Sequence, residues 1–133
     1  MESTQSKFPK QGETWLIDYT FNFSKFKDSE FEIENQIKKL RPSIILSNNI
    51  QNEFNNRLIV APLTSKSIDI VNHPFEILIK KDKENGLEKD SKILLNFLVS
   101  LDKEYRLNKY LGKVNKTEIS KVLNGVNILF KSF

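Results

Sequence analysis

The sequence predicts a mainly β domain of the α+β class: a small antiparallel barrel or open β-roll with one amphipathic helix packed on it. Two observations predict this fold. Short apolar segments rich in β-branched or aromatic residues recur at close spacing, with turn-forming Gly, Pro and Asn between them. The last segment shows the periodicity of a helix instead. Because 133 residues is the length of one domain, we expect residues 1–133 to fold as a single domain.

The first expected strand covers residues 13–23, directly after the turn residue Gly12. Trp15, Ile17 and Tyr19 alternate onto one face, which is the period-two pattern of a strand. Further strands are expected at residues 42–47, 58–64, 75–79, 92–99 and 109–114. Pro62 predicts an edge strand or a bulge, because proline cannot donate a ladder hydrogen bond. The asparagines that cluster between residues 48 and 56 predict a loop.

Helical structure is expected in three places. Residues 24–40 are charged and lack Gly and Pro, and the spacing of their apolar residues favours a short helix, with an extended flap as the alternative. A helical turn is expected at residues 102–107. The last helix follows Asn115, with Glu118 three residues later, which is the spacing of a capping box. Its apolar stripe comprises Ile119, Val122, Leu123, Val126, Leu129 and Phe130.

Composition narrows the classes of function. The chain has no cysteine, which excludes disulfide scaffolds, thiol nucleophiles and zinc fingers. Its one histidine, His73, cannot build a His-rich metal site, and we expect it on the surface at a strand-entry turn. No apolar run approaches the roughly 20 residues of a membrane span, and residues 1–11 lack the apolar stretch of a signal peptide. We therefore expect a cytoplasmic protein, and its net charge of +4 is compatible with binding nucleic acid.

Two places could carry chemistry, although no common catalytic signature such as a Gly-rich phosphate loop is present. Arg41 stands at the mouth of a buried strand, where arginine is usually a salt-bridge partner but its rigid fork also suits a phosphate. Thr64 and Ser65 end another apolar strand, where two hydroxyls often only cap a turn. From the residues alone, the structural and the functional interpretations both stay open.

Several short segments follow one another in the order of a known family. Residues 11–18, QGETWLID, are similar to the pattern G-[ED]-[IV]-[WY]-x-[VA]-[DN], and residues 36–48, QIKKLRPSIILSN, to E-x-x-x-x-R-P-[AV]-[LV]-[VI]-[IL]-S-N. Residues 58–65, LIVAPLTS, resemble a strand ending in P-[IL]-T-[ST], and residues 86–95, GLEKDSKILL, resemble G-L-x-[KR]-D-S-x-[IV]-L-[LA]. Shorter matches lie at residues 73–77, 102–107 and 111–114. Together they resemble the MazF/PemK/Kid family of plasmid-maintenance ribonuclease toxins.

The resemblance implies an SH3-like β-barrel, a homodimer, and an endoribonuclease that cuts single-stranded RNA and is restrained by an antitoxin protein. The family's catalytic arginine and threonine fall on Arg41 and Thr64. Residues 24–40 lead into Arg41, and we expect them to form a long flap that borders the site. No metal ion and no cofactor is expected. RNA binding is expected at Ser65, Lys38, Lys39 and Gln36.

The chain departs from the family at several positions. Gln36 replaces a glutamate that the family carries five residues before the arginine, and Leu40 replaces a small or polar residue next to it. Phe97 and Val99 stand where many members have Gln and Arg. The cut-site sequence of the family therefore does not transfer to this chain.

Two alternatives compete with the endoribonuclease. An inactive barrel that only binds nucleic acid would have the same fold and basic charge. A gyrase poison of the CcdB type would also share the fold, but such chains end in Trp-Gly-Ile, whereas this one ends in Phe-Lys-Ser-Phe. Incubating the protein with long RNA and with supercoiled DNA separately distinguishes the three.

Overall fold

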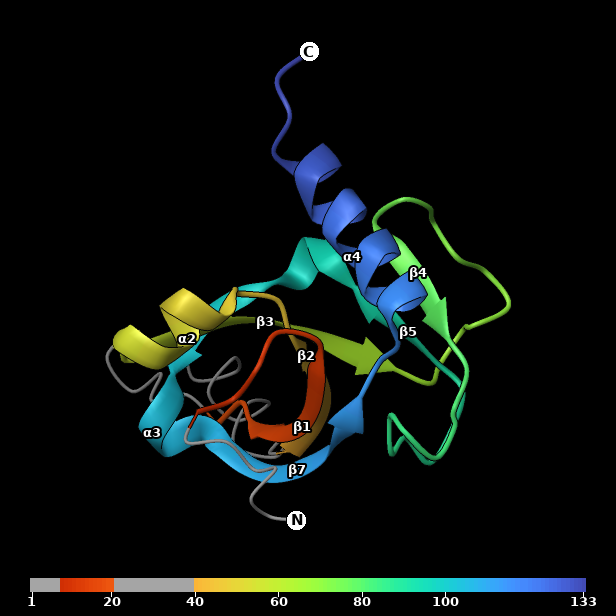
Figure 1. Cartoon of the computed structure of the whole chain (residues 1–133). Coiled ribbons are helices and arrows are strands. Elements are labelled where there is room, and N and C mark those ends of the chain that lie inside the picture. Colours follow the sequence, from red (N-terminus) through yellow and green to blue (C-terminus); the bar gives the residue numbers. More distant parts are fainter. Residues whose placement is uncertain (1–7, 21–39) are drawn as a thin grey trace, which may run out of the picture.

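The computed structural model describes residues 8–20 and 40–133. Within them, seven strands form an antiparallel sheet in the order β4-β5-β3-β2-β1-β7, with β6 paired to β3 (Figure 1). The strands are β1 Glu13–Asp18, β2 Leu40–Ile45, β3 Arg57–Thr64, β4 Glu76–Ile79, β5 Ser91–Leu94, β6 Val99–Asp102 and β7 Leu107–Lys113. The helices are α2 Asn49–Phe54, α3 Lys103–Arg106 and α4 Lys116–Leu129, with a 3₁₀ turn at Leu95–Phe97.

The centre of the sheet is β3, because it pairs with three neighbours along different parts of its length. Residues 57–60 pair with β6, residues 63–64 with β5, and residues 60–62 with β2. The predicted antiparallel β architecture with a C-terminal helix is confirmed. The described pairings run from β4 to β7, and none of them joins these two strands, so the sheet is open in this part of the chain.

Two apolar clusters fill the two faces of the sheet. Because successive side chains of a strand point to opposite faces, Ile44 and Ile45 on β2 enter different clusters. The Ile44 cluster lies under α4 and gathers side chains from β3, β4 and β5, whereas the Ile45 cluster gathers them from β1, β3 and β6. Figure 1 shows the same division, with α4 beside β4 and β5 and the curved β1–β2–β7 part lying apart from it.

The helix α4 begins as the sequence predicts. Asn115 accepts a hydrogen bond from the Glu118 backbone N–H at 2.7 Å, and the Glu118 carboxylate accepts one from the Asn115 N–H at 3.0 Å. Val122 and Gly125 are the buried residues of this helix. Gly125 lowers the helix propensity, but a Cβ there would lie 2.6 Å from the Pro74 carbonyl oxygen. The missing side chain is therefore what lets α4 approach the segment before β4.

The asparagine-rich stretch contains a helix, so the loop predicted there is wrong. Asn48 caps α2 by accepting a hydrogen bond from the Gln51 N–H at 2.9 Å. Asn52 is fully buried; its amide donates to the Ser47 carbonyl oxygen at 2.9 Å, and its own carbonyl oxygen accepts from the Ser47 hydroxyl. Asparagine signals a loop because its side chain competes with helical hydrogen bonding. Here the same side-chain groups cap and anchor a short helix instead.

The edge position expected for Pro62 and the single strand expected at residues 92–99 are also wrong. Pro62 lies in the central strand rather than at an edge. It sits where β3 changes its partner from β6 to β5, a point at which the ladder is interrupted and a missing N–H costs little. The predicted strand at residues 92–99 is divided into β5, the 3₁₀ turn and the start of β6. The apolar pattern cannot show this break, because the Leu95 side chain in the turn is as buried as the strand residues around it.

The remaining expectations concern the end of the first strand, residues 24–40, the exposure of His73 and membrane-spanning helices. β1 confirms the first strand up to Asp18. Residues 19 and 20 of the expected strand lie beyond the end of β1, and residues 21–23 lie outside the described residues. The helix or flap expected at residues 24–40 lies outside them as well, except for Leu40, which begins β2. His73 is exposed, as predicted. In the described part of the chain, no helix is long and apolar enough to cross a membrane.

Candidate active site

Arg41 lies on β2, between β1 and β3. In the pairing of β2 with β3, Ser43 is opposite Pro62. The same register, continued by two residues on each strand, places Arg41 opposite Thr64. Directly opposite residues of an antiparallel pair point to the same face of the sheet, with Cβ atoms about 5 Å apart. The pairing itself ends at Ser43 and Pro62, so the register brings the two residues predicted to be catalytic to the adjoining ends of neighbouring strands.

Thr64 is the last residue of β3, and its side chain already has a structural role. Its Oγ1 accepts a hydrogen bond from the Lys66 backbone N–H at 3.2 Å. This is the turn-capping role that a hydroxyl often has at the end of a strand. A hydroxyl that accepts one hydrogen bond still has its own proton to donate. Capping the turn and binding a phosphoryl oxygen are therefore compatible.

Arg41, Thr64 and Ser65 all line one pocket of about 640 Å³. Its other walls come from β1, β7 and the segment before β5. The volume lies within the range of roughly 300–1,000 Å³ that is usual for small-ligand sites. Among the described residues, the charged side chains that line it are those of Arg41, Lys66, Lys89, Lys109 and Glu88. This excess of positive charge suits a polyanionic ligand.

The half-buried Tyr19 lies close enough to Arg41 for the positive charge of Arg41 to affect its pKa. The Tyr19 and Ser43 hydroxyl oxygens are 2.6 Å apart and share a hydrogen bond in which either can donate. Burial raises the pKa of Tyr19 to about 12, although that hydrogen bond and the positive charge of Arg41 both act to lower it. Tyr19 therefore stays neutral at physiological pH. Among the described residues, neither ion pair of the chain involves Arg41.

The structure brings together half of the site residues predicted from sequence. Arg41, Thr64 and Ser65 share the pocket. The other three, Lys38, Lys39 and Gln36, lie outside the described residues, and their roles stay predictions. Phe97, one of the departures from the family pattern, is exposed in the 3₁₀ turn and is not among the described residues that line the pocket.

Sequence reasoning missed the lysines of the pocket. Lys66 follows Ser65 directly, so its position beside the predicted site is a signal that could have identified it. Lys109 reaches the pocket only because β7 pairs with β1, where it lies opposite Leu16. Nothing local in the sequence indicates which strand β7 pairs with.

Lys89 reaches the pocket through a turn that depends on glycine. Gly86 has a φ of +67°, a conformation that other residues rarely adopt. A Cβ at Gly86 would lie 2.1 Å from the Leu111 carbonyl oxygen. The turn therefore packs directly on β7 and brings the residues after it to the pocket wall.

Comparison with known proteins places the chain in a family. A family model described as PemK-like, MazF-like toxin of type II toxin-antitoxin system matches residues 10–130. The chain belongs to this family. The matched residues run from just before β1 to the end of α4, so they include Arg41, Thr64 and the pocket between them.

Curated relatives of this MazF-like toxin come from staphylococci. The chain is 34% identical to the endoribonuclease MazF of Staphylococcus saprophyticus over 89 residues, which are 67% of this chain and 72% of the relative. The endoribonuclease MazF of Staphylococcus epidermidis shows the same identity over the same length.

Solved structures share the fold at lower identity. One is an endoribonuclease in complex with its cognate antitoxin from a mycobacterial species, with a TM-score of 0.67 and 17% identity over 94% of this chain and 98% of that one. Another is a MazE-MazF complex from Deinococcus radiodurans, with a TM-score of 0.64 and 18% identity over 96% of this chain and 100% of that one. At these identities the similarity concerns the fold of the MazF-like toxin.

Proposed function

We propose that this toxin is a metal-independent endoribonuclease that cuts single-stranded RNA by activating the RNA's own 2′-OH. The observation that carries the proposal is that Arg41 and Thr64 line one pocket together with Lys66, Lys89 and Lys109. Family membership supports it, because two curated relatives are named endoribonuclease MazF. We also propose that the curved part of the sheet is the SH3-like barrel that the family resemblance implies.

The proposed reaction is an in-line transfer at phosphorus. The 2′-oxygen loses its proton and bonds to the adjacent phosphorus, and the bond from phosphorus to the 5′-oxygen breaks. The 5′-oxygen takes up a proton, so the products are a 2′,3′-cyclic phosphate and a 5′-OH end. The phosphorane between these states carries extra negative charge. A positioned cation with several N–H donors lowers its energy more than that of the ground state.

Arg41 meets this need through its charge and its planar fork, which can bind two phosphoryl oxygens at once. It is poorly suited to moving protons, because the guanidinium pKa exceeds 12. Thr64 can donate its hydroxyl proton to a phosphoryl oxygen while its Oγ1 keeps the bond from Lys66 N–H. The two residues would thus hold one phosphate from adjacent strands. Protons can pass to water or to Glu88, the carboxylate on the pocket wall.

Cleavage of RNA should persist when divalent metal is removed. In the described part of the chain, no three His, Cys, Asp or Glu side chains are placed to hold a metal ion. We expect the purified protein to cut a long single-stranded RNA at the same rate with and without excess EDTA. Supercoiled DNA should stay intact, because it lacks the attacking 2′-OH. Activity that EDTA abolishes and magnesium restores would contradict the mechanism, and binding of RNA without any cutting would favour the inactive barrel.

The proposed partners follow from the family. We propose that a cognate antitoxin protein restrains this toxin in the cytoplasm, since two similar solved structures are named as complexes with an antitoxin or with MazE. The antitoxin and single-stranded RNA are then alternative partners of the same protein. The experiment that checks this is inhibition of RNA cleavage by the purified antitoxin at a fixed molar ratio.

A homodimer is also expected. Several large apolar side chains are exposed on the single chain, which is typical of a surface that a second copy covers. They include Phe54, Phe97, Tyr105 and Phe130, exposed by 78%, 58%, 74% and 71%. Light scattering at low micromolar concentration should give about twice the 15.5 kDa of one chain. A mass of a single chain across that range would contradict the expectation.

A further inference from the structure

A buried lysine lies next to the candidate site. Lys92 on β5 is directly opposite Thr64 on β3, so the two side chains leave the same face of the sheet. The Lys92 side chain is only 8% exposed. Its Nζ is 2.9 Å from the Glu76 carboxylate and donates to the Ile70 carbonyl oxygen at 2.7 Å. The ammonium therefore joins β5, β4 and the loop between β3 and β4.

Glu76 holds the same loop at a second point. Its Oε1 accepts a hydrogen bond from the Asn72 backbone N–H at 3.1 Å. The pKa of Glu76 lies below its ordinary value, first because Lys92 donates a hydrogen bond to it and then because Asn72 does. Glu76 is therefore ionised at neutral pH, and its pair with Lys92 is an ion pair.

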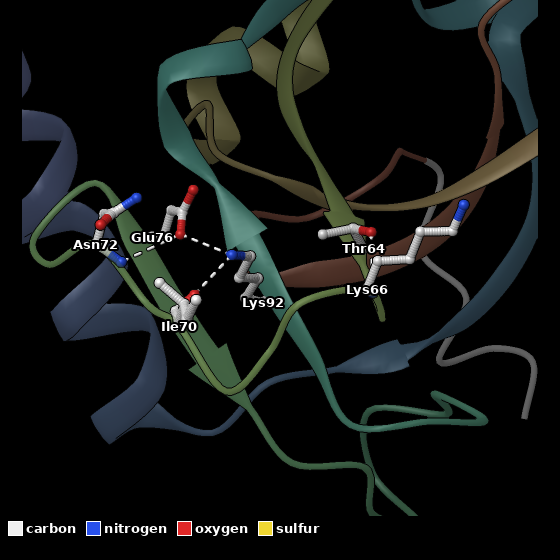
Figure 2. Close-up of polar contacts among 6 residues, drawn as sticks. All are labelled: Thr64, Lys66, Ile70, Asn72, Glu76 and Lys92. Carbon is white, nitrogen blue, oxygen red and sulfur yellow. Dashed lines mark hydrogen bonds and ion pairs between the residues drawn. The ribbon is translucent and has the colours of Figure 1, made fainter.

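These contacts fix the 65–75 loop, which carries Ser65 and Lys66 at the pocket. Figure 2 shows Lys92 pointing toward Glu76 and Ile70, whereas Lys66 points the opposite way, past Thr64. Among the described residues, Lys92 on β5 binds the loop at Ile70 and Glu76 on β4 binds it at Asn72. Loss of the Lys92 ammonium would remove the hydrogen bond at Ile70, four residues after Lys66.

The Lys92 side chain is buried and that of Glu76 is 14% exposed, so we expect this ion pair to add little net stability. Removing a lysine and a glutamate from water is costly, and replacing a buried pair by well-packed apolar residues is often neutral or stabilising. The Lys92–Glu76 pair differs from an apolar pair in one respect that matters here. It supplies a donor and an acceptor that bind the loop backbone at Ile70 and Asn72.

We propose that Lys92 is a positioning residue for RNA binding: with Glu76 it holds the 65–75 loop so that Lys66 meets the RNA backbone at the pocket. The inference rests on the endoribonuclease function proposed above. The backbones of Arg41 and Thr64 are placed by strand pairing, and among the described residues the loop contacts Thr64 only through the adjacent Lys66 N–H. Loosening the loop should therefore weaken the binding of RNA and leave the chemical step nearly unchanged.

The test compares Lys92→Met with Lys103→Met by steady-state kinetics on an oligoribonucleotide that the wild type cuts. Lys103 is a matched control, because its ammonium also donates to backbone carbonyls, but to those of Asn52 and Glu53 on α2, which is not part of the 65–75 loop. For Lys92→Met we expect KM to rise by about tenfold, because one side chain that contacts the RNA is no longer held in place. We expect kcat to stay within about twofold of the wild type. The control should change neither constant by more than twofold. A fall in kcat with KM unchanged, or no change at all, overturns the proposal.

A double-mutant cycle with Lys66 shows whether Lys92 acts through it. If the loop only serves to present Lys66, then Lys66→Ala removes what Lys92 positions, and adding Lys92→Met to it should raise KM by less than twofold further. Multiplication of the two separate effects would show that they are independent and would overturn the proposal.

Two further measurements distinguish an effect of Lys92→Met on folding stability from an effect on RNA binding. The pair Lys92→Met with Glu76→Met restores an apolar interior, so its melting temperature should match or exceed that of Lys92→Met alone while KM stays high. Recovery of KM together with stability would show that Lys92 is merely structural.

Binding of a 2′-O-methyl oligoribonucleotide and hydrogen exchange of the 66–72 amides test the loop without any cleavage. If the wild type binds but does not cut, the proposed function fails, yet weaker binding and faster exchange in Lys92→Met would still support the positioning role.

Discussion

Replacing Arg41 with alanine is expected to lower the rate of RNA cleavage by about 10²–10³, the usual cost of losing one preorganised group that stabilises the transition state. The reason is that Arg41 supplies charge and paired N–H donors to the phosphorane, and lysine residues around the pocket supply only point charges. Arg41 is half-buried near the start of β2, so truncating it should leave the fold intact. Single-turnover cleavage of a defined RNA measures the rate, and thermal melting checks the fold.

Arg41→Lys is the informative companion variant. It keeps the positive charge near Tyr19 and the pocket but loses the planar fork. We expect it to remain close to the alanine variant in rate, because two oxygens of one phosphate can no longer be held together. Full activity in Arg41→Lys would show that charge alone suffices, and wild-type cutting by Arg41→Ala would place the active site elsewhere.

Thr64→Val should also lower the single-turnover rate by about 10²–10³, because it keeps the shape of the side chain and removes the hydroxyl donor. The change also removes the acceptor for the Lys66 N–H, so some loss of stability is expected, about 1 kcal/mol for one hydrogen bond. Thr64→Ser is the matched control, since it retains the hydroxyl, and its rate should stay within a few-fold of the wild type. Equal rates for Val and Ser at this position would rule out a role for the hydroxyl in the reaction.

Elements with a strong local signal could be predicted from the sequence. The helix α4 is one, because Asn115, Glu118 and a regular apolar stripe all indicate the same helix, and both capping hydrogen bonds are present. The strand β3 is another, with its apolar run ending at Thr64. By contrast, α2 could not be predicted, because asparagine side chains can cap a helix as well as form a loop. The break between β5 and β6 was hidden within one continuous apolar run.

For the candidate site too, single residues could be predicted from the sequence, whereas their arrangement in space could not. Arg41 and Thr64 could be singled out one at a time, as an arginine and a threonine at the ends of apolar strands, but only the family resemblance paired them. Their actual meeting depends on the register of β2 on β3. Lys109 depends on the register of β7 on β1, and Lys92 on the pairing of β5 with β3 and β4. Such long-range registers are set by the whole sheet, so a single sequence does not reveal them.

Identification of the RNA ends is the most direct test of the central claim, that this protein activates a 2′-OH rather than a metal-bound water. A long RNA is digested in excess EDTA, and the ends at each cut are identified by their ability to accept phosphate from a kinase or to be ligated. The proposed mechanism predicts a 5′-OH and a 2′,3′-cyclic phosphate at every cut, and no such cuts with Arg41→Ala. Ends bearing a 5′-phosphate and a 3′-OH would contradict it.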